Sequence, residues 1–346
     1  MVKIEHKRGR LVLYLKDLKL EWAIEPRYWR NPFLVVGLLA LLPLLIKGRP
    51  DLLTLITTAN IYACIAIPLA WQMTGTGRLN FGPQFFVGIG GFTAALLSIH
   101  YGWGPMQTLP VVLVMGLLFG IMVSPLTTIA KGLYFSLLTL ILPLVFLELT
   151  YVYTGLFKGE TGLSGITHLV NLGSIQLNYV VSCYLSLGMM VIFLFIVDKV
   201  LRSRIGLYAA AINDDEDVAS AMGVNINRWK IIAFTISCAM ITTVGWFIAH
   251  YFGTFAGITY LPLVFMLKIL LMVMIGGRGE IYGSIVGAYF VCSLEKGLTS
   301  FLGPIHYVLF PAILLILLWV LPEGLYGLYR KHAYREYYPT IRLRNR

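Results

Sequence analysis

The residues with the clearest capacity for chemistry are ionisable side chains inside long apolar runs: Glu148, Lys268, Glu295 and Lys296. A charge in such a run is costly, and it marks a functional position by default. Lys268 falls near the middle of its run, so it must either pair or face water. The hypothesis is that it pairs with Glu148 or Glu295. The other three lie nearer the ends of their runs, where a long side chain can reach water.

A compact acidic cluster lies within a polar segment at 198–229. Asn213 suits an N-cap, and Glu216 three residues later can complete a capping box in an acidic first turn. Gly223 suits the left-handed residue that ends a helix. These features predict a short helix over 214–222. Because so short a helix is unstable alone, it must dock on the protein's own surface or in a partner's groove.

The sequence gives no pattern typical of a catalytic or metal site. The six histidines are scattered, with no His-x-x-x-His pair. The four cysteines lie singly in apolar runs and are expected to be packing residues; they are Cys64, Cys183, Cys238 and Cys292. No G-x-x-x-x-G-K-[ST] loop is present, so we expect this chain to bind no cofactor and to hydrolyse no ATP.

Composition places these residues in a membrane. The chain has 346 residues, of which 58% are hydrophobic and 12% charged, and its mean hydropathy is +0.80. Long, solidly apolar runs predict membrane-spanning helices rather than the alternating strands of a barrel. The predicted fold class is an all-α integral membrane protein with about ten spans. These cover 33–46, 52–73, 81–99, 109–129, 133–155, 179–197, 230–253, 261–276, 283–300 and 306–322.

The net charge of +11 follows the positive-inside pattern, which excludes a nucleic-acid partner as its explanation. With ten spans, most basic residues fall on the side that holds both termini and segment 198–229. We therefore expect three parts: a cytoplasmic basic segment 1–32, a membrane domain 33–322, and a basic cytoplasmic tail 323–346. Residues 11–22 are expected to be a surface helix or an ordered tail, and the last stretch is expected to lie among anionic headgroups.

Several stretches resemble one family closely. They are TGTGRLNFGPQFFVGIGGFTAALLS at 74–98, KGLYFSLLTL at 131–140, GETGLSGI at 159–166, SRIGLYAAAINDDEDVASAMGVNINRWKIIAFTIS at 203–237 and KILLMVMIGGRGEIYGSIVGAYF at 268–290. Together they are similar to the permease subunits of branched-chain amino acid ABC importers, of the LivM type. The chain departs from many relatives at Gly82-Pro83 and at Lys268, where a glutamate is common.

The resemblance implies a type II importer permease in the plasma membrane of a prokaryote. Its partners would be two ATPase subunits that use ATP and Mg²⁺, a second permease of the LivH type, and an external solute-binding protein. The external loop 156–178 would dock the last of these. Alternatives are a related permease for urea, amides or another small solute, and a secondary transporter that needs no ATPase.

The resemblance also assigns residues. The ATPase-coupling helix would use Asn213, Asp214, Asp215, Glu216, Asp217, Ala219, Met222 and Gly223. Separately, the glycine clusters and the intramembrane lysine predict a translocation path that includes Gly77, Asn80, Gly82, Gly88, Lys268, Gly276 and Gly277. The glycines have two readings: they let helices approach closely, or they break helices so that a helix N-terminus faces an anionic solute.

Overall fold

The computed structural model describes residues 2–7, 10–15, 18–23 and 48–305 except 131, 278 and 279, with isolated positions at 43, 46, 309–310, 312–313, 316 and 324–325. The chain divides into two compact units, Met1–Ile46 and Lys47–Arg346. The predicted spans 33–46 and 306–322 lie almost wholly outside the described residues, and so does the basic tail from residue 326 onward.

The first unit contains a three-stranded antiparallel sheet in the order β1-β2-β3. Its strands are β1 (Val2–Lys7), β2 (Arg10–Leu15) and β3 (Leu18–Ala23). The expected surface helix over 11–22 is therefore wrong. Residues 18–22 alternate apolar and charged, as Leu-Lys-Leu-Glu-Trp. That period of two matches a strand, in which successive side chains point to opposite faces.

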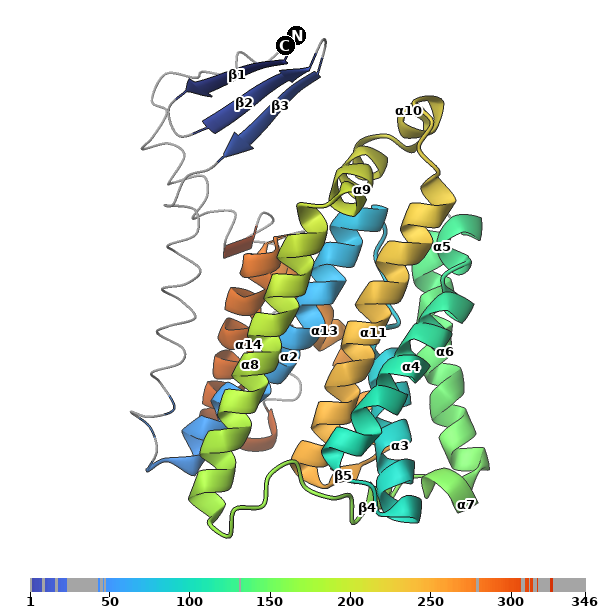
Figure 1. The fold of residues 1–346 in the computed structure, drawn as a ribbon. Helices are drawn as coiled ribbons and strands as arrows, with labels where there is room; N and C mark the ends of the chain where they lie inside the picture. Colours follow the sequence, from blue (N-terminus) through green and yellow to red (C-terminus); the bar gives the residue numbers. More distant parts are fainter. Residues whose placement is uncertain are drawn as a thin grey trace. The chain divides into compact units, whose positions relative to one another are not determined.

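The second unit is a helical bundle (Figure 1), and in its described part seven segments are long and apolar enough to cross a membrane. They are α2 (Pro50–Thr76), α3 (Pro83–Tyr101), α4 with α5 (Pro105–Val123, Leu126–Ile129), α6 (Leu133–Val152), α8 (Ile175–Leu201), α11 (Ile226–Phe252), and α12 with α13 (Gly257–Tyr260, Leu263–Gly276). Each coincides with a predicted span, which confirms the all-α membrane class. The predicted span 283–300 falls in α14 (Ile281–Leu302), a 22-residue helix that is not among the seven.

Helices α3 and α11 cross at a glycine contact. A Cβ atom built on Gly90 of α3 would lie 1.9 Å from the carbonyl oxygen of Thr242 on α11. One built on Gly245 of α11 would lie 2.1 Å from the carbonyl oxygen of Val87 on α3. Each helix thus supplies the glycine that the other's backbone requires.

Helices α13 and α14 pack in the same way. A Cβ atom on Gly276 would lie 2.0 Å from the carbonyl oxygen of Gly283, and one on Gly287 would lie 1.9 Å from that of Met272. For these clusters the close-packing reading of the glycines explains the contacts.

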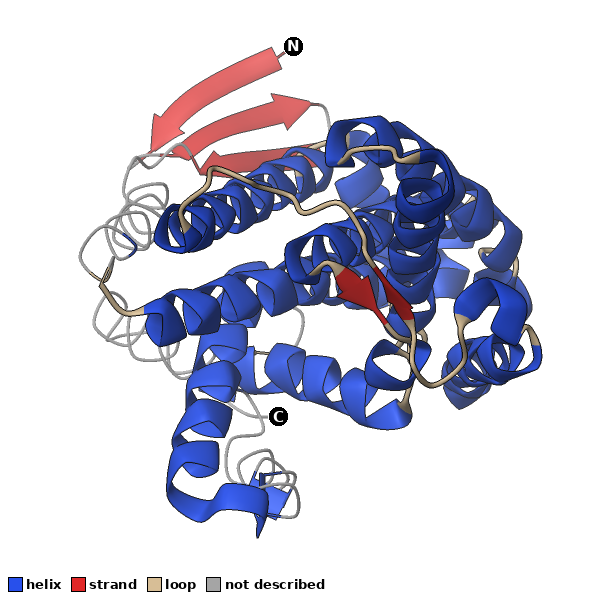
Figure 2. Ribbon diagram, turned by 90° about the horizontal axis from the view of Figure 1, so that it is seen from below, coloured by secondary structure: helices blue, strands red, loops and turns tan. Residues whose placement is uncertain are grey.

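The bundle has two different ends. At one end, α9 (Arg204–Asp214) and α10 (Glu216–Ala221) follow α8 and lead into α11 (Figure 1). At the other end, β4 (Leu163–Ser164) pairs antiparallel with β5 (Thr254–Phe255), near α7 (Thr154–Phe157). Figure 2 looks onto that end and shows these two short strands lying across the helices.

Candidate functional site

The polar segment between α8 and α11 folds into two helices, and the second, α10, corresponds to the predicted short helix. Its N-cap is Asp215, whose Oδ1 accepts hydrogen bonds from the backbone N–H groups of Asp217 at 2.9 Å and Val218 at 3.0 Å. The predicted N-cap at Asn213 is wrong, because Asn213 and Asp214 are the last two residues of α9. Asp215 is extended, with φ −159° and ψ 115°, and this breaks the helix in two.

The predicted end of the helix at Gly223 is confirmed. Gly223 has φ +85°, its N–H donates to the carbonyl of Ser220 at 2.9 Å, and the N–H of Val224 donates to that of Ala219 at 3.1 Å. This pair of bonds is a Schellman motif, which satisfies the last carbonyls of a helix. The short α10 is therefore capped at both ends by its own sequence.

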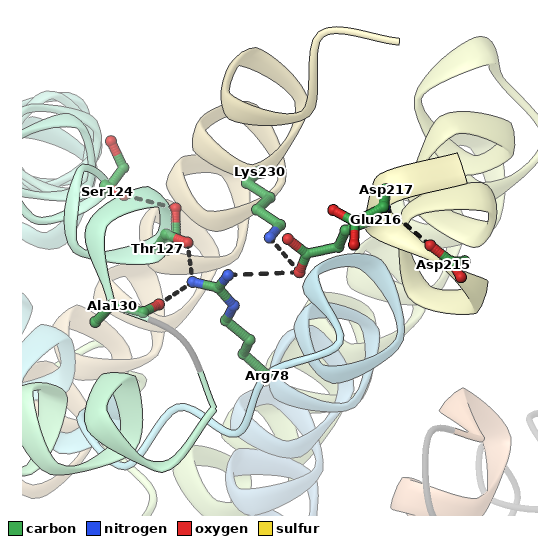
Figure 3. A network of polar contacts seen from close by, with 8 residues as sticks. All are labelled: Arg78, Ser124, Thr127, Ala130, Asp215, Glu216, Asp217 and Lys230. Atoms are coloured by element: carbon green, nitrogen blue, oxygen red, sulfur yellow. Dashed lines mark hydrogen bonds and ion pairs between the residues drawn. The ribbon is translucent and has the colours of Figure 1, made fainter. Parts of the chain in front are cut away.

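Glu216 anchors α10 to the membrane helices. Its Oε1 accepts from Nζ of Lys230, at the start of α11, at 2.5 Å, and from Nη2 of Arg78, in the α2–α3 connection, at 3.4 Å (Figure 3). Lys230 and Arg78 are both buried, whereas the Glu216 side chain is 35% exposed. The sequence predicts a capping box for Glu216 but carries no local signal for Lys230 or Arg78 as its partners.

Arg78 joins a third element to this network. Its Nη1 donates to the carbonyl oxygens of Thr127 and Ala130 at the end of α5 (Figure 3). A cation suits the carbonyl end of a helix, where the last oxygens lack partners within the helix. Through Arg78, the α2–α3 connection, α5 and α10 therefore meet at one point.

The charges around Glu216 determine its titration. Burial alone raises the pKa of its carboxyl group, but the hydrogen bond and charge of Lys230, followed by those of Arg78, outweigh it and hold the pKa below its usual value. Glu216 is therefore ionised at neutral pH, and both contacts are ion pairs.

The side of α10 away from these anchors is apolar and exposed. Val218 is 56% exposed and Met222 is 79% exposed, and their spacing of four residues places them on one face. Ala219 is buried instead, so it contacts the protein itself and not a surface that a partner could reach. Helix α10 thus docks on its own protein by one side and presents a small apolar face on the other.

Helix α9 is held close to the bundle as well. Tyr208 of α9 stacks on Trp229 of α11, with ring centroids 4.7 Å apart. Gly77, which ends α2 with φ +65°, lies under the end of α9, where an added Cβ would be 3.3 Å from Oδ1 of Asn213. The structure therefore places Gly77 beside the polar element.

The other residues expected in a path lie at close helix contacts. Asn80 is buried, donates to Oε1 of Gln72 at 3.1 Å and accepts from the N–H of Gly82 at 2.8 Å. A Cβ on Gly82 would be 2.5 Å from the carbonyl oxygen of Thr139, and one on Gly88 would be 2.7 Å from Leu261. Gly276 packs on α14, and Gly277 follows α13 with φ +135°.

The expected pairing of Lys268 is confirmed for one of its two candidates. Nζ of Lys268 on α13 forms an ion pair with Oε2 of Glu295 on α14, and it donates to the hydroxyl of Tyr62 on α2 at 3.3 Å. Glu148 lies elsewhere, on an exposed face of α6.

A single buried histidine, for which the sequence carries no prediction, fixes the loop before α8. His250, buried near the end of α11, binds the carbonyl oxygen of Thr167 through Nδ1 at 2.7 Å and the hydroxyl of Thr108 through Nε2 at 2.8 Å. Its own carbonyl accepts from the N–H of Leu169 at 2.9 Å. A lone histidine in an apolar run carries no local signal for such distant partners.

Comparison with known proteins decides the family. Residues 52–318 match the family model described as branched-chain amino acid transport system / permease component. The chain belongs to this family. It is thus a permease subunit of the type II ABC class and a multi-pass membrane protein whose described membrane segments are helices, and its relatives are named as transport proteins rather than enzymes. No solved structure matches it.

Three relatives indicate the range of the family. The high-affinity branched-chain amino acid transport system permease protein LivM of Escherichia coli is 26% identical over 324 residues, which are 86% of this chain and 73% of that protein. The ribose import permease protein RbsC of Haemophilus influenzae is 24% identical, over 84% of this chain and 92% of its own. The permease protein LivH of Escherichia coli is 28% identical over 36% of this chain and 40% of its own.

Proposed function

We propose that this permease subunit imports branched-chain or other hydrophobic amino acids, and that α10 is the helix through which an ATPase subunit drives it. The observation that carries the proposal is the two-sided character of α10. One side is bound to Lys230 and Arg78 through Glu216, and the other exposes Val218 and Met222. An exposed apolar face on a short, capped helix suits insertion into a groove of a soluble partner.

The similarity to LivM over most of the chain supports amino acids as the solute. The similarity to RbsC, whose name specifies ribose, supports a second candidate: the same transport mechanism with a sugar or another small polar solute such as urea or an amide. The ion pairs that hold α10 are compatible with either solute, so they do not discriminate between the two candidates.

The proposed assembly contains this chain, a second permease of the LivH type, two ATPase subunits that use ATP and Mg²⁺, and an external solute-binding protein. We place the complex in the inner membrane of a prokaryote. The two chain ends and α10 would face the cytoplasm, while the loop 156–178 would face the binding protein.

The ion pairs suggest how movement reaches the membrane. A displacement of α10 by the ATPase would act on α11 through Lys230, and on α5 and the α2–α3 connection through Arg78. Because these contacts reach separate membrane segments, one cytoplasmic movement could shift them together and alternate the access of the solute between the two sides.

The test uses the complete transporter and two acidic substitutions, Val218→Asp and Met222→Asp. Both should leave the protein in the membrane and the ATPase active, but they should uncouple ATP hydrolysis from leucine uptake. Ser220→Asp is the matched control, because Ser220 is also exposed on α10 but lies off the Val218–Met222 face. Uptake equal to wild type in both test variants would contradict the assignment of α10.

A cysteine at Met222 gives a direct measure of the contact. All four native cysteines are buried, so a thiol introduced at this exposed position would be the reactive one. We expect Met222→Cys to crosslink to the ATPase subunit and to resist a membrane-impermeant maleimide applied outside intact cells. Labelling from outside would refute the proposed orientation.

A further inference from the structure

A charged group lies at mid-depth between the membrane helices and takes no part in the anchorage of α10. Lys268 lies within α13, at about 8 Å along the axis from Leu263 and about 12 Å from Gly276, at 1.5 Å per residue. Glu295 lies on α14 at about 10 Å along the axis from Leu302. Ionisable groups at such depth are retained mainly where they face a partner or a polar path.

The pair is bound to its neighbours but is not fully buried. Nζ of Lys268 is bound to Oε2 of Glu295 and to the hydroxyl of Tyr62, and it lies 4.3 Å from the centroid of the Tyr62 ring. Even so, 14% of the Lys268 side chain and 32% of the Glu295 side chain are exposed. Burying both charges completely would carry a large desolvation cost. Partial exposure lowers this cost and leaves part of each charged group open to a polar contact.

Tyr62, which lies beside the lysine, is the first of a row of aromatic rings. The rings of Tyr62 and Phe265 have centroids 5.7 Å apart, and those of Phe265 and Tyr260 have centroids 5.6 Å apart. Aromatic faces attract an ammonium group and also accommodate an aliphatic side chain. The ligand chemistry that fits this site therefore combines an anion, a cation and an apolar group.

We propose that Lys268 and Glu295 form an intramembrane subsite for a zwitterionic solute. The solute carboxylate would replace Glu295 on Lys268, and its ammonium group would bind Glu295 beside Tyr62. The exchange conserves charge, because one ion pair is replaced by two while the total charge stays zero. The inference rests on the proposed import of amino acids, and it excludes an uncharged sugar as the preferred ligand of this subsite.

The test measures binding to the complete transporter in lipid nanodiscs, without the external binding protein. The probes are L-leucine, L-leucinamide, which lacks the carboxylate, and 4-methylpentanoate, which lacks the ammonium group. Wild type should prefer L-leucine to either analogue by about tenfold or more, the ratio expected for one hydrogen bond to a charged group. Lys268→Gln should abolish the preference over L-leucinamide, and Glu295→Gln should abolish the preference over 4-methylpentanoate.

Lys296→Gln is the matched control, since Lys296 is an exposed cation next to Glu295 in the chain, and both preferences should survive it. Should the single variants fail to assemble, the exchanged pair Lys268→Glu with Glu295→Lys keeps an ion pair and reverses its polarity. Weaker L-leucine binding in an exchanged protein that assembles normally supports the subsite, and unchanged binding overturns it.

The outcomes separate the two proposals. If the wild-type complex binds no L-leucine, the proposed solute is wrong, and the subsite is refuted with it. If the wild type binds L-leucine and both preferences persist in Lys268→Gln and Glu295→Gln, only the subsite is refuted, and the pair is a structural link between α13 and α14.

Discussion

Replacing Glu216 with glutamine should release α10 from the bundle while preserving its size. The substitution removes the charge that binds Lys230 at 2.5 Å and Arg78 at 3.4 Å. Breaking a buried ion pair from one side costs about 3–5 kcal/mol. Since the Glu216 side chain is 35% exposed, solvent screening reduces this to roughly 1.5–3 kcal/mol.

That loss should raise the population of undocked α10 by roughly 10- to 150-fold, because about 1.4 kcal/mol corresponds to a factor of ten. The assay is hydrogen–deuterium exchange of peptides from 204–224 in nanodiscs, combined with ATP-driven uptake. Exchange should accelerate by a comparable factor, and uptake should fall. Asp217→Asn is the matched control: it removes the same charge from an exposed position, and we expect a change of about 1 kcal/mol or less.

Lowering the pH should release α10 from the bundle in the wild type, as Glu216→Gln does at neutral pH. The pKa of Glu216 is lowered in the folded state from its ordinary 4.5, so its contribution is complete above that value and is lost as the pH falls through the lower, folded-state pKa. Exchange of α10 in Glu216→Gln should lack this acid-dependent step. If exchange in Glu216→Gln stays within about twofold of wild type, less than the tenfold shift that 1.4 kcal/mol would give, the anchorage described above is wrong.

Two further substitutions test the packing of the bundle. Gly90→Ala places a Cβ 1.9 Å from the carbonyl oxygen of Thr242 and should destabilise the detergent-solubilised protein by about 1–3 kcal/mol or more. Gly188→Ala in α8 should be neutral or stabilising, because an added Cβ would have no atom within 4 Å beyond the backbone of its own helix. Equal melting temperatures for the two variants would contradict the tight crossing of α3 and α11. His250→Leu removes the partner of Thr167 and Thr108, so it should raise exchange in the loop 163–169 by an amount equivalent to about 1–3 kcal/mol. His100→Leu, at an exposed end of α3, should leave that loop unchanged, and protection retained in His250→Leu would refute the role of the buried ring.

The features that could be predicted from the sequence are those that local chemistry determines. Seven apolar runs became helices because a membrane-length apolar segment satisfies its own backbone groups. Gly223 ended α10 because a left-handed residue favours glycine. The position of the N-cap was harder to predict, since five consecutive residues from Asn213 to Asp217 are all polar and three of the first four can cap equally well.

The features that could not be predicted depend on distant partners. Nothing near Glu216 in the chain indicates Arg78, which is separated from it by 138 residues. His250 and Thr108 are likewise 142 residues apart. Lys268 was an easier case, because few ionisable residues lie within the spans and two of them, Glu148 and Glu295, are acidic. In the first unit, by contrast, a local signal for a strand was present. The apolar and charged residues of β3 alternate with a period of two, although residues 11–22 as a whole suggest an amphipathic helix.

Helix α11 connects the two ends of the bundle without a break. It carries Lys230, which binds α10, near its first residue, and His250, which holds the loop before α8, near its last. The two residues are about 30 Å apart along a single helix axis. Because both contacts lie on one continuous helix, a displacement of α10 and a protein bound to the loop before α8 would act on the same structural element.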